Sequence, residues 1–466
     1  MLFSSIPFLY YFLPGVLILY FISPKKLKNT ALLLSSLVFY GWGEPKYVVL
    51  MIASIIIGYI SGLLIEAFNK KKTAKVVVAL SVLINLLFLG FFKYSDFFIE
   101  NFNTATGLSV PLLRVALPIG ISFYTFQILS YTVDVYRGDV KAQKNFINLA
   151  AYITMFPQLI AGPIVRYSHI AKQLEERTLS FENLAKGMRR FVFGLGKKIF
   201  LANTLGELCD VFKASDDKSV LFYWLYAVAF ALHVYFDFSG YSDMAIGLGR
   251  IMGFRFMENF NYPYISKSAT EFWRRWHISL GSWFRDYVYI PLGGNRVSRL
   301  RWFFNILVIW FLTGMWHGAA WNFIIWGIYF AVVLIIEKLF LLKFLNKTKV
   351  IGRVYTLIVV VISFVIFNAS DMKEAFSYIG GMFGAGEVPL VSKELVYYLK
   401  NFAVVIILGI IGATPVVKKA VEKIAENKCA SRVLVVVEPL VLVVLMVSMT
   451  AYLVDGSFNP FLYFRF

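Results

Sequence analysis

The chain has 466 residues, of which 59% are hydrophobic and 16% are charged. Soluble domains are about 45–50% apolar and about 25% charged, so this composition, with a mean hydropathy of +0.70, excludes an ordinary soluble domain. A net charge of +19 would indicate nucleic-acid binding in a soluble protein, but here the lysines and arginines cluster between long apolar runs. That arrangement is typical of the cytoplasmic loops of an all-α, multi-pass membrane protein with no nucleic-acid partner.

Four apolar runs near the N-terminus are predicted to span the membrane, and they cover residues 7–23, 30–42, 46–68 and 76–94. Lysines cluster directly after the first run and after the third, which places those two loops in the cytoplasm and the N-terminus outside. No basic segment precedes the first run and no small-residue cleavage site follows it, so we expect a retained membrane anchor.

The next two apolar runs, 117–127 and 146–165, are interrupted by proline and glycine, notably at Pro157. Such breaks survive at membrane depth only where protein or a water-filled cavity satisfies the freed backbone groups. Two interpretations stay open: kinked packing helices, or re-entrant segments that line an internal passage. Residues 169–190 are polar and predict an amphipathic surface helix with a solvated His169.

Acidic residues follow the apolar run 219–238, in the segment Asp237-Phe-Ser-Gly-Tyr241-Ser-Asp243. Acids at membrane depth are costly and face a cavity or a partner. Asp237 and Asp243 could orient catalytic groups, but pairing with an arginine is the favoured interpretation. His233, just before them, is interpreted as a packing histidine.

The remaining apolar runs bring the expected number of transmembrane helices to about 10–12; they cover residues 191–205, 321–342, 351–368, 399–414 and 433–454. No internal repeat is evident, so we expect a single membrane-embedded domain, 1–466, with a core motif region at 117–330. The two cysteines, Cys209 and Cys429, have no spacing typical of a metal site or a disulfide framework.

Two of the four histidines lie in the stretch 271–330, His277 among arginines and His317 inside an apolar run. The arginines predict that His277 lies at the cytoplasmic boundary. Residues 302–315 supply 14 mainly apolar residues, too few for a full span of about 20. The chain is therefore expected to climb from the boundary at His277 to a deep position at His317.

A histidine at that depth suits general-base catalysis, because burial favours the neutral, proton-accepting ring. Such a base could take the proton of an acceptor hydroxyl while that hydroxyl attacks a thioester carbonyl. The alternative is a packing histidine that hydrogen-bonds across helices. The flanking Gly314 and Gly318 permit close backbone approach and fit either interpretation.

The order of these residues resembles the signature of the membrane-bound O-acyltransferases, in particular their bacterial alginate O-acetyltransferase-like branch. The resemblance extends over the whole chain. The segments that carry it are 271–277, 283–287, 291–296 and 316–318, and further similarity lies at 117–127, 161–163, 237–243 and 459–466.

The resemblance implies a ring of membrane helices, with re-entrant and amphipathic helices, around a central tunnel. His317 matches the catalytic base and His277 the second catalytic position. The residues expected to line the substrate tunnel or to support the site are Trp316, Asn322, Asp237, Tyr241, Asp243, Arg274 and Arg285.

The implied reaction passes an acyl group, with acetyl favoured, across the bilayer to hydroxyls of an extracytoplasmic polysaccharide. The donor would be acyl-CoA (acetyl-CoA) or an acyl carrier protein on the cytoplasmic side, and an exported acyltransferase partner protein could relay the group. No bound cofactor and no metal are expected. Three alternatives remain: D-alanyl transfer to teichoic acid from a carrier protein, lysophospholipid acylation, and a transporter or flippase without covalent chemistry.

Overall fold

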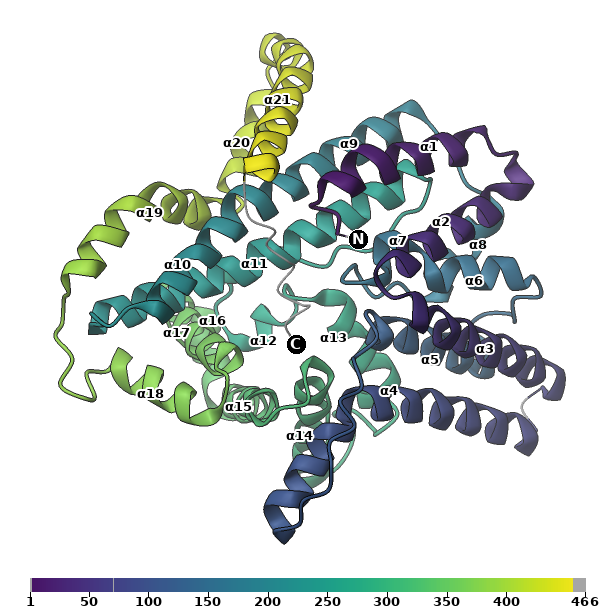
Figure 1. The fold of residues 1–466 in the computed structure, drawn as a ribbon, viewed down its shortest axis with the longest axis horizontal. Helices are drawn as coiled ribbons and strands as arrows, with labels where there is room; N and C mark the ends of the chain where they lie inside the picture. Colours follow the sequence, from purple (N-terminus) through teal and green to yellow (C-terminus); the bar gives the residue numbers. More distant parts are fainter. Residues whose placement is uncertain (1, 70, 456–466) are drawn as a thin grey trace. The chain divides into compact units, whose positions relative to one another are not determined.

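The computed structural model describes residues 2–69 and 71–455, and this part of the chain is helical, without a strand (Figure 1). The predicted all-α class is therefore confirmed. The motif expected at 459–466 lies outside the described residues.

Seven helical segments are long and apolar enough to cross a membrane, by length and composition. They are Pro45–Phe68 (a short turn and α3, Val48–Phe68), α4 (Lys72–Thr106), α11 (Val220–Ile251), Trp321–Lys347 (α15, Trp321–Ile336, a π-helical turn and α16, Leu342–Lys347), α17 (Lys349–Asn368), α19 (Lys393–Gly412) and α21 (Lys428–Asp455). The apolar segment Pro7–Ile22 is shorter. The protein is thus a multi-pass membrane protein, with fewer full-length spans in the described residues than the 10–12 expected.

The other apolar runs fold into shorter helices, because proline, glycine and polar residues interrupt them. The remaining helices are α1 (Leu13–Ile22), α2 (Lys28–Gly43), α5 (Ile121–Arg137), α6 (Phe146–Thr154), α7 (Phe156–Leu159), α8 (Tyr167–Glu175), α9 (Phe181–Gly196), α10 (Thr204–Ala214), α12 (Ala269–Phe272), α13 (Ile278–Phe284), α14 (Arg299–His317), α18 (Met372–Met382) and α20 (Val416–Ala425).

The chain divides into two compact units. The first comprises residues 1–191 and 244–257, and the second comprises 192–243 and 258–466. Every residue predicted for the catalytic site belongs to the second unit. The expectation of a single domain over 1–466 stays a prediction.

In the first unit, the break around Pro157 is enclosed by protein. Gln158 donates a side-chain hydrogen bond to the carbonyl of Tyr152 (2.6 Å), and the Tyr152 hydroxyl donates to the carbonyl of Val165 (2.9 Å). These side chains satisfy backbone groups that the broken helix leaves free. Packing within protein therefore accounts for the interruption at this position.

The surface helix expected over 169–190 is two helices, α8 and α9, with a break between them. Ser180 explains the new start, since its Oγ accepts the backbone N–H of Asn183 at 3.2 Å and so caps the first turn of α9. His169 lies exposed on α8, as predicted.

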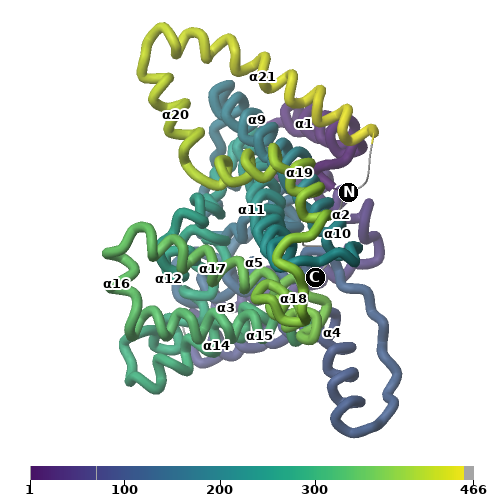
Figure 2. The backbone as a smooth tube through the Cα atoms, turned by 90° about the vertical axis from the view of Figure 1, so that its left-hand side faces the viewer, coloured from purple at the N-terminus to yellow at the C-terminus, as the bar shows by residue number. Residues whose placement is uncertain are grey.

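In the second unit, α14 and α15 lie side by side at very close range (Figures 1 and 2). A Cβ atom on Gly314 would lie 2.4 Å from the carbonyl oxygen of Phe323, and one on Gly327 would lie 2.2 Å from that of Trp310. Small residues at such a crossing let two membrane helices approach to backbone contact. The two glycines thereby fix the position of His317, the last residue of α14.

Replacing Gly327 with alanine should therefore destabilise the protein. The added methyl group must separate α14 from α15, at a cost of about 1–3 kcal/mol typical of overpacking. Thermal unfolding in detergent would measure the loss. Gly90→Ala is the matched control, because a Cβ there meets nothing within 4 Å; equal melting temperatures for the two variants would contradict the close crossing.

Candidate active site

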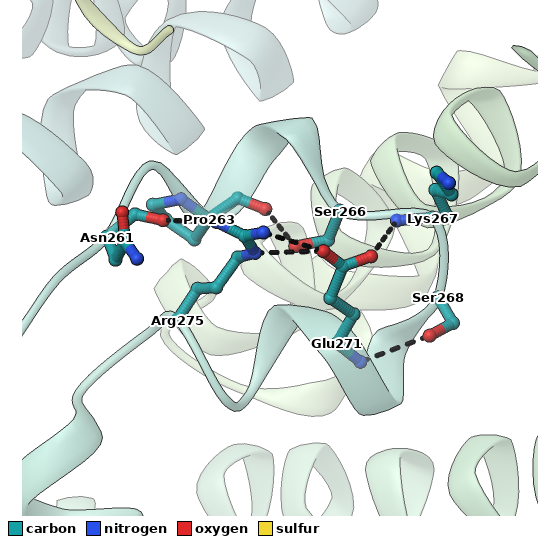
Figure 3. A network of polar contacts seen from close by, with 7 residues as sticks. All are labelled: Asn261, Pro263, Ser266, Lys267, Ser268, Glu271 and Arg275. Carbon is teal, nitrogen blue, oxygen red and sulfur yellow. Dashed lines mark hydrogen bonds and ion pairs between the residues drawn. The ribbon is translucent and has the colours of Figure 1, made fainter. Parts of the chain in front are cut away.

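The segment leading to the first histidine of the site is held by a network of polar contacts around Glu271 (Figure 3). The backbone N–H of Glu271 donates to Ser268 Oγ at 3.1 Å, and its carboxylate accepts the backbone N–H of Lys267 at 3.0 Å. Arg275 donates to the same carboxylate at 2.9 Å and to the carbonyl of Asn261 at 3.1 Å. Glu271 and Arg275 thus fix the path of the chain.

A second carboxylate, that of Glu337, anchors the start of α12. It is fully buried and accepts the backbone N–H groups of Ala269 (2.6 Å) and Thr270 (2.9 Å). A negative charge at a helix N-terminus is favourable, because the first N–H groups there have no partner within the helix. Glu337 follows α15, so this contact ties α12 to the end of that membrane helix.

His277 has a left-handed backbone, with φ +43° and ψ +53°. For a residue other than glycine this conformation costs about 1–2 kcal/mol. The following residue holds it in place, since the N–H of Ile278 donates to the carbonyl of Asn259 at 3.0 Å. Strain of this kind persists where the surroundings over-determine the backbone, and it concentrates at functional sites.

The side chain of Asn259 fixes the protonation of the His277 ring. Its Oδ1 accepts the backbone N–H of Ser279 (3.2 Å) and the Ser279 hydroxyl (2.8 Å), and lies 3.2 Å from Nδ1 of His277. The backbone N–H of Ser279 can only donate, so the Asn259 atom that faces it is the amide oxygen and not the NH2 group. This oxygen can only accept, so Nδ1 of His277 carries the hydrogen. The lone pair of the neutral ring is therefore on Nε2. Asn259 is held in turn by donating to Ser242 Oγ at 3.1 Å.

Nε2 of His277 is buried and has no hydrogen-bond partner among the described residues, and the side chain is only 2% exposed. The ring packs edge-on against Phe238 at 4.7 Å and against Trp316 at 5.7 Å between centroids. Burial lowers the pKa of His277 to about 3. The site therefore presents a neutral ring nitrogen with an available lone pair.

His317 is half-buried among aromatic rings. Its ring centroid lies 5.0 Å from that of Trp316, 5.0 Å from that of Trp326 and 5.1 Å from that of Phe367. The indole of Trp316 thus contacts both histidines of the predicted pair. His277 and His317, 40 positions apart in the sequence, thus lie against the same side chain.

The expected steady climb from His277 to His317 is wrong. The 19 residues of α14 extend about 28 Å, so the chain runs away from His277 to Arg299 and then returns along α14 to Trp316. His277 is buried, whereas Arg274 and Arg285 are exposed, and Arg285 pairs with its neighbour Asp286. The arginines identify a loop and do not mark the position of the histidine.

The two acids of α11 pair with lysines, which corrects the expectation of an arginine partner. Lys198 contacts Asp237 at 2.5 Å, with both side chains at most 2% exposed, and Lys197 contacts Asp243 at 2.7 Å. Both lysines were visible in the sequence, next to one another in a neighbouring apolar run. Tyr241, between the acids, is also buried.

Asn322, predicted near the site, joins two helices that carry its walls. It is buried, and its Nδ2 donates to the carbonyls of Phe367 (3.2 Å) and Ala369 (2.9 Å) at the end of α17. Phe367 in turn contacts His317.

His233 lies in a separate contact. Its Nδ1 is 2.6 Å from the carbonyl oxygen of Ala202, so its predicted packing role is confirmed.

Sequence reasoning missed several side chains that surround the two histidines: Phe238, Asn259, Ser279, Trp326 and Phe367. Gly314 and Gly318, which flank Trp316-His317, indicated close packing at this position. No motif distinguished Asn259 from the other asparagines.

A multi-pass helical protein with two histidines gathered on one buried indole has the make-up of a membrane enzyme that uses acid–base chemistry. The model of the membrane-bound O-acyltransferase family matches residues 137–377, more than half of the chain. The chain belongs to this family and is an O-acyltransferase. The alternative of transport without covalent chemistry is thereby set aside.

Three bacterial relatives show how far the similarity extends. The probable alginate O-acetylase of Azotobacter vinelandii is 42% identical over 88% of this chain and 85% of its own length. The peptidoglycan O-acetyltransferase of Helicobacter pylori is 33% identical over 86% of this chain and 84% of its own. The teichoic acid D-alanyltransferase of Bacillus subtilis is 31% identical over 53% of this chain and 65% of its own.

The buried His277 predicts a specific pH dependence of stability. Its pKa is about 3 in the folded protein, against an ordinary value of 6.5, so between these values the unfolded chain binds more protons. Stability should fall as the pH drops through this window, by up to about 1.4 kcal/mol per pH unit from this group. Thermal unfolding between about pH 7 and about pH 4 should show a shallower dependence for His277→Gln. The exposed His169→Gln should keep the wild-type slope; a slope shared by all three proteins would contradict the prediction.

Proposed function

We propose that the protein transfers an acyl group, with acetyl favoured, from a cytoplasmic thioester to hydroxyls of an extracytoplasmic polysaccharide, directly or through an exported partner protein. The observation that carries this proposal is the meeting of His277 and His317 on the indole of Trp316. Two imidazoles beside one buried aromatic ring supply a proton acceptor and a second polar atom in surroundings of low dielectric.

The relatives support acetyl over D-alanyl. Two relatives named as O-acetyl-transferring enzymes, with alginate and peptidoglycan as acceptors, align with more than four fifths of this chain. The relatives named as teichoic acid D-alanyltransferases align with 53–54% of it, at 27–31% identity. Polysaccharide O-acetylation is accordingly our first choice, with D-alanylation as the alternative.

In the proposed step, the acceptor hydroxyl oxygen attacks the thioester carbonyl carbon and the hydroxyl proton passes to a ring nitrogen of His317. The new C–O bond forms, the C–S bond breaks, and the leaving thiolate takes the proton back from the imidazolium. His277 contributes its Nε2, which Asn259 fixes as an acceptor that can hold a substrate O–H or N–H in register.

The proposed route across the membrane is consistent with the length of α14. Arg299 and Arg301 begin this helix, and the positive-inside bias places them on the cytoplasmic side. His317 ends it about 28 Å further on, well away from these arginines. An acceptor arriving from outside would meet His317, and the acyl group would travel outward from the cytoplasmic donor to reach it.

His317→Ala should abolish transfer. Loss of a general base typically costs about 10²–10⁴-fold in rate, so acetyl ester on the acceptor should fall to background in membrane vesicles supplied with labelled acetyl-CoA and polysaccharide. His169→Ala removes an exposed histidine and should retain wild-type transfer. Full transfer by properly inserted His317→Ala protein would sink the proposal, and label transferred only from D-alanyl carrier protein would favour the alternative.

His277→Ala should also reduce transfer, and Asn259→Ala should reduce it by about tenfold, the value of one hydrogen bond of about 1.4 kcal/mol. Without Asn259, the His277 ring loses the contact that fixes its tautomer. The control is Asn261→Ala, two residues away and exposed. If Asn259→Ala matched this control in initial rate, the positioning of His277 by Asn259 would have no role in transfer.

A further inference from the structure

In the first unit, two basic side chains are held next to one another by neutral partners. Lys28 is 8% exposed, and its ammonium donates to the carbonyl of Tyr20 at 2.7 Å and lies 4.7 Å from the centre of the Tyr20 ring. This carbonyl belongs to the last turn of α1, where a cation is favourable. The contact accounts for one of the three N–H groups of Lys28.

Arg177 approaches the same tyrosine from the loop between α8 and α9. Its guanidinium lies 4.6 Å from the centre of the Phe254 ring and 5.8 Å from that of Tyr20, and it donates to Oδ1 of Asn29. Nη1 of Arg177 is buried and has no hydrogen-bond partner in the part of the chain that the structure describes. Arg177 as a whole is half-buried, so it stands at the edge of the protein.

No carboxylate compensates these two charges within residues 2–69 and 71–455, where neither Lys28 nor Arg177 forms an ion pair. Glu175 and Glu176 precede Arg177 in the sequence and are exposed. Burial, and then the charge of Arg177, lower the pKa of Lys28. Buried charges of like sign without a counter-ion are costly, so an anion bound between them would be stabilising.

We infer that Lys28 and Arg177 form a binding site for a phosphate group, namely that of an anionic phospholipid. Their remaining N–H groups match phosphate oxygens, which take charge-assisted hydrogen bonds from lysine and arginine. Lys28 is the first residue of α2 and directly follows the 3-10 turn Lys25–Leu27.

The surroundings identify a lipid as the source of the phosphate. The end of α1, directly before the site, exposes the apolar side chains of Ile18, Phe21 and Ile22 to 42–77%. These can contact acyl chains, while the exposed Lys25 and Lys26 lie at the level expected for head groups after an apolar segment. A soluble phosphate would make no use of the apolar part of this surface.

The test uses the full-length protein, purified in detergent and stripped of lipid, with its unfolding temperature followed during titration. We expect phosphatidylglycerol to stabilise the wild type, and phosphatidylcholine and inorganic phosphate to do so far less. Lys28→Gln and Arg177→Gln should weaken the response to phosphatidylglycerol by about tenfold or more. Lys172→Gln, which removes an exposed lysine nearby, should respond as the wild type does.

An equal response of Arg177→Gln and the wild type would overturn the site, and stabilisation by inorganic phosphate alone would overturn its assignment to a lipid. Should the glutamine variants not fold, Lys28→Arg and Arg177→Lys keep both charges and should retain the preference for phosphatidylglycerol over phosphatidylcholine. Absence of that preference in these variants and the wild type would also refute the proposal. The readout involves no acyl transfer, so its result is independent of the proposed function.

Discussion

The side-chain oxygen of Asn259 is the acceptor on which the geometry of His277 depends. It accepts hydrogen bonds from His277 and Ser279, two residues apart, and so sets both the tautomer of the ring and the turn into α13. The left-handed backbone of His277 is costly by itself. It is maintained by these contacts together with the hydrogen bond from the N–H of Ile278 to the carbonyl of Asn259. A single amide thus leaves Nε2 of His277 as the ring nitrogen that carries the available lone pair.

The support of Asn259 reaches into a membrane helix. Its Nδ2 donates to Ser242 of α11, and the same helix is held by the pairs Asp237–Lys198 and Asp243–Lys197. A buried ion pair adds little net stability, but it penalises any shift that separates the charges. The lysine pairs therefore suit a helix whose register positions a polar contact to the site.

On the other side of the site, contact between glycines and backbone positions His317. Gly314 and Gly327 bring α14 onto α15, so that the end of α14 lies over the ring of Trp326. The aromatic rings around His317 give it apolar surroundings. His277 is buried against Phe238 and Trp316, and this burial raises the cost of charging its ring, which explains why it is neutral.

The sequence predicted the parts of this arrangement that follow from local pattern. Apolar runs and basic loops identified a helical membrane protein. His317 was singled out as an ionisable residue inside an apolar run, and His277 was predicted as a site residue from the family resemblance. What could not be predicted is contact across long separations: Asn259 with His277, Lys198 with Asp237, and the return of α14 to Trp316. The positive-inside bias locates loops relative to the bilayer, so it placed the arginines correctly as surface residues but misjudged His277, whose side chain turns inward from the same segment.

Buried basic side chains have two kinds of partner in this protein, a carboxylate or only neutral groups. Lys198 has its counter-ion within the chain, in Asp237, so this pair is complete without a ligand. Lys28 and Arg177 have aromatic faces and amide or carbonyl oxygens around them. Cation–π contacts and neutral acceptors offset part of the desolvation of each group, but they do nothing to reduce the repulsion between the two. Only an anion offsets the repulsion between Lys28 and Arg177. At the end of an apolar helix in a membrane protein, the most abundant anion is a lipid phosphate.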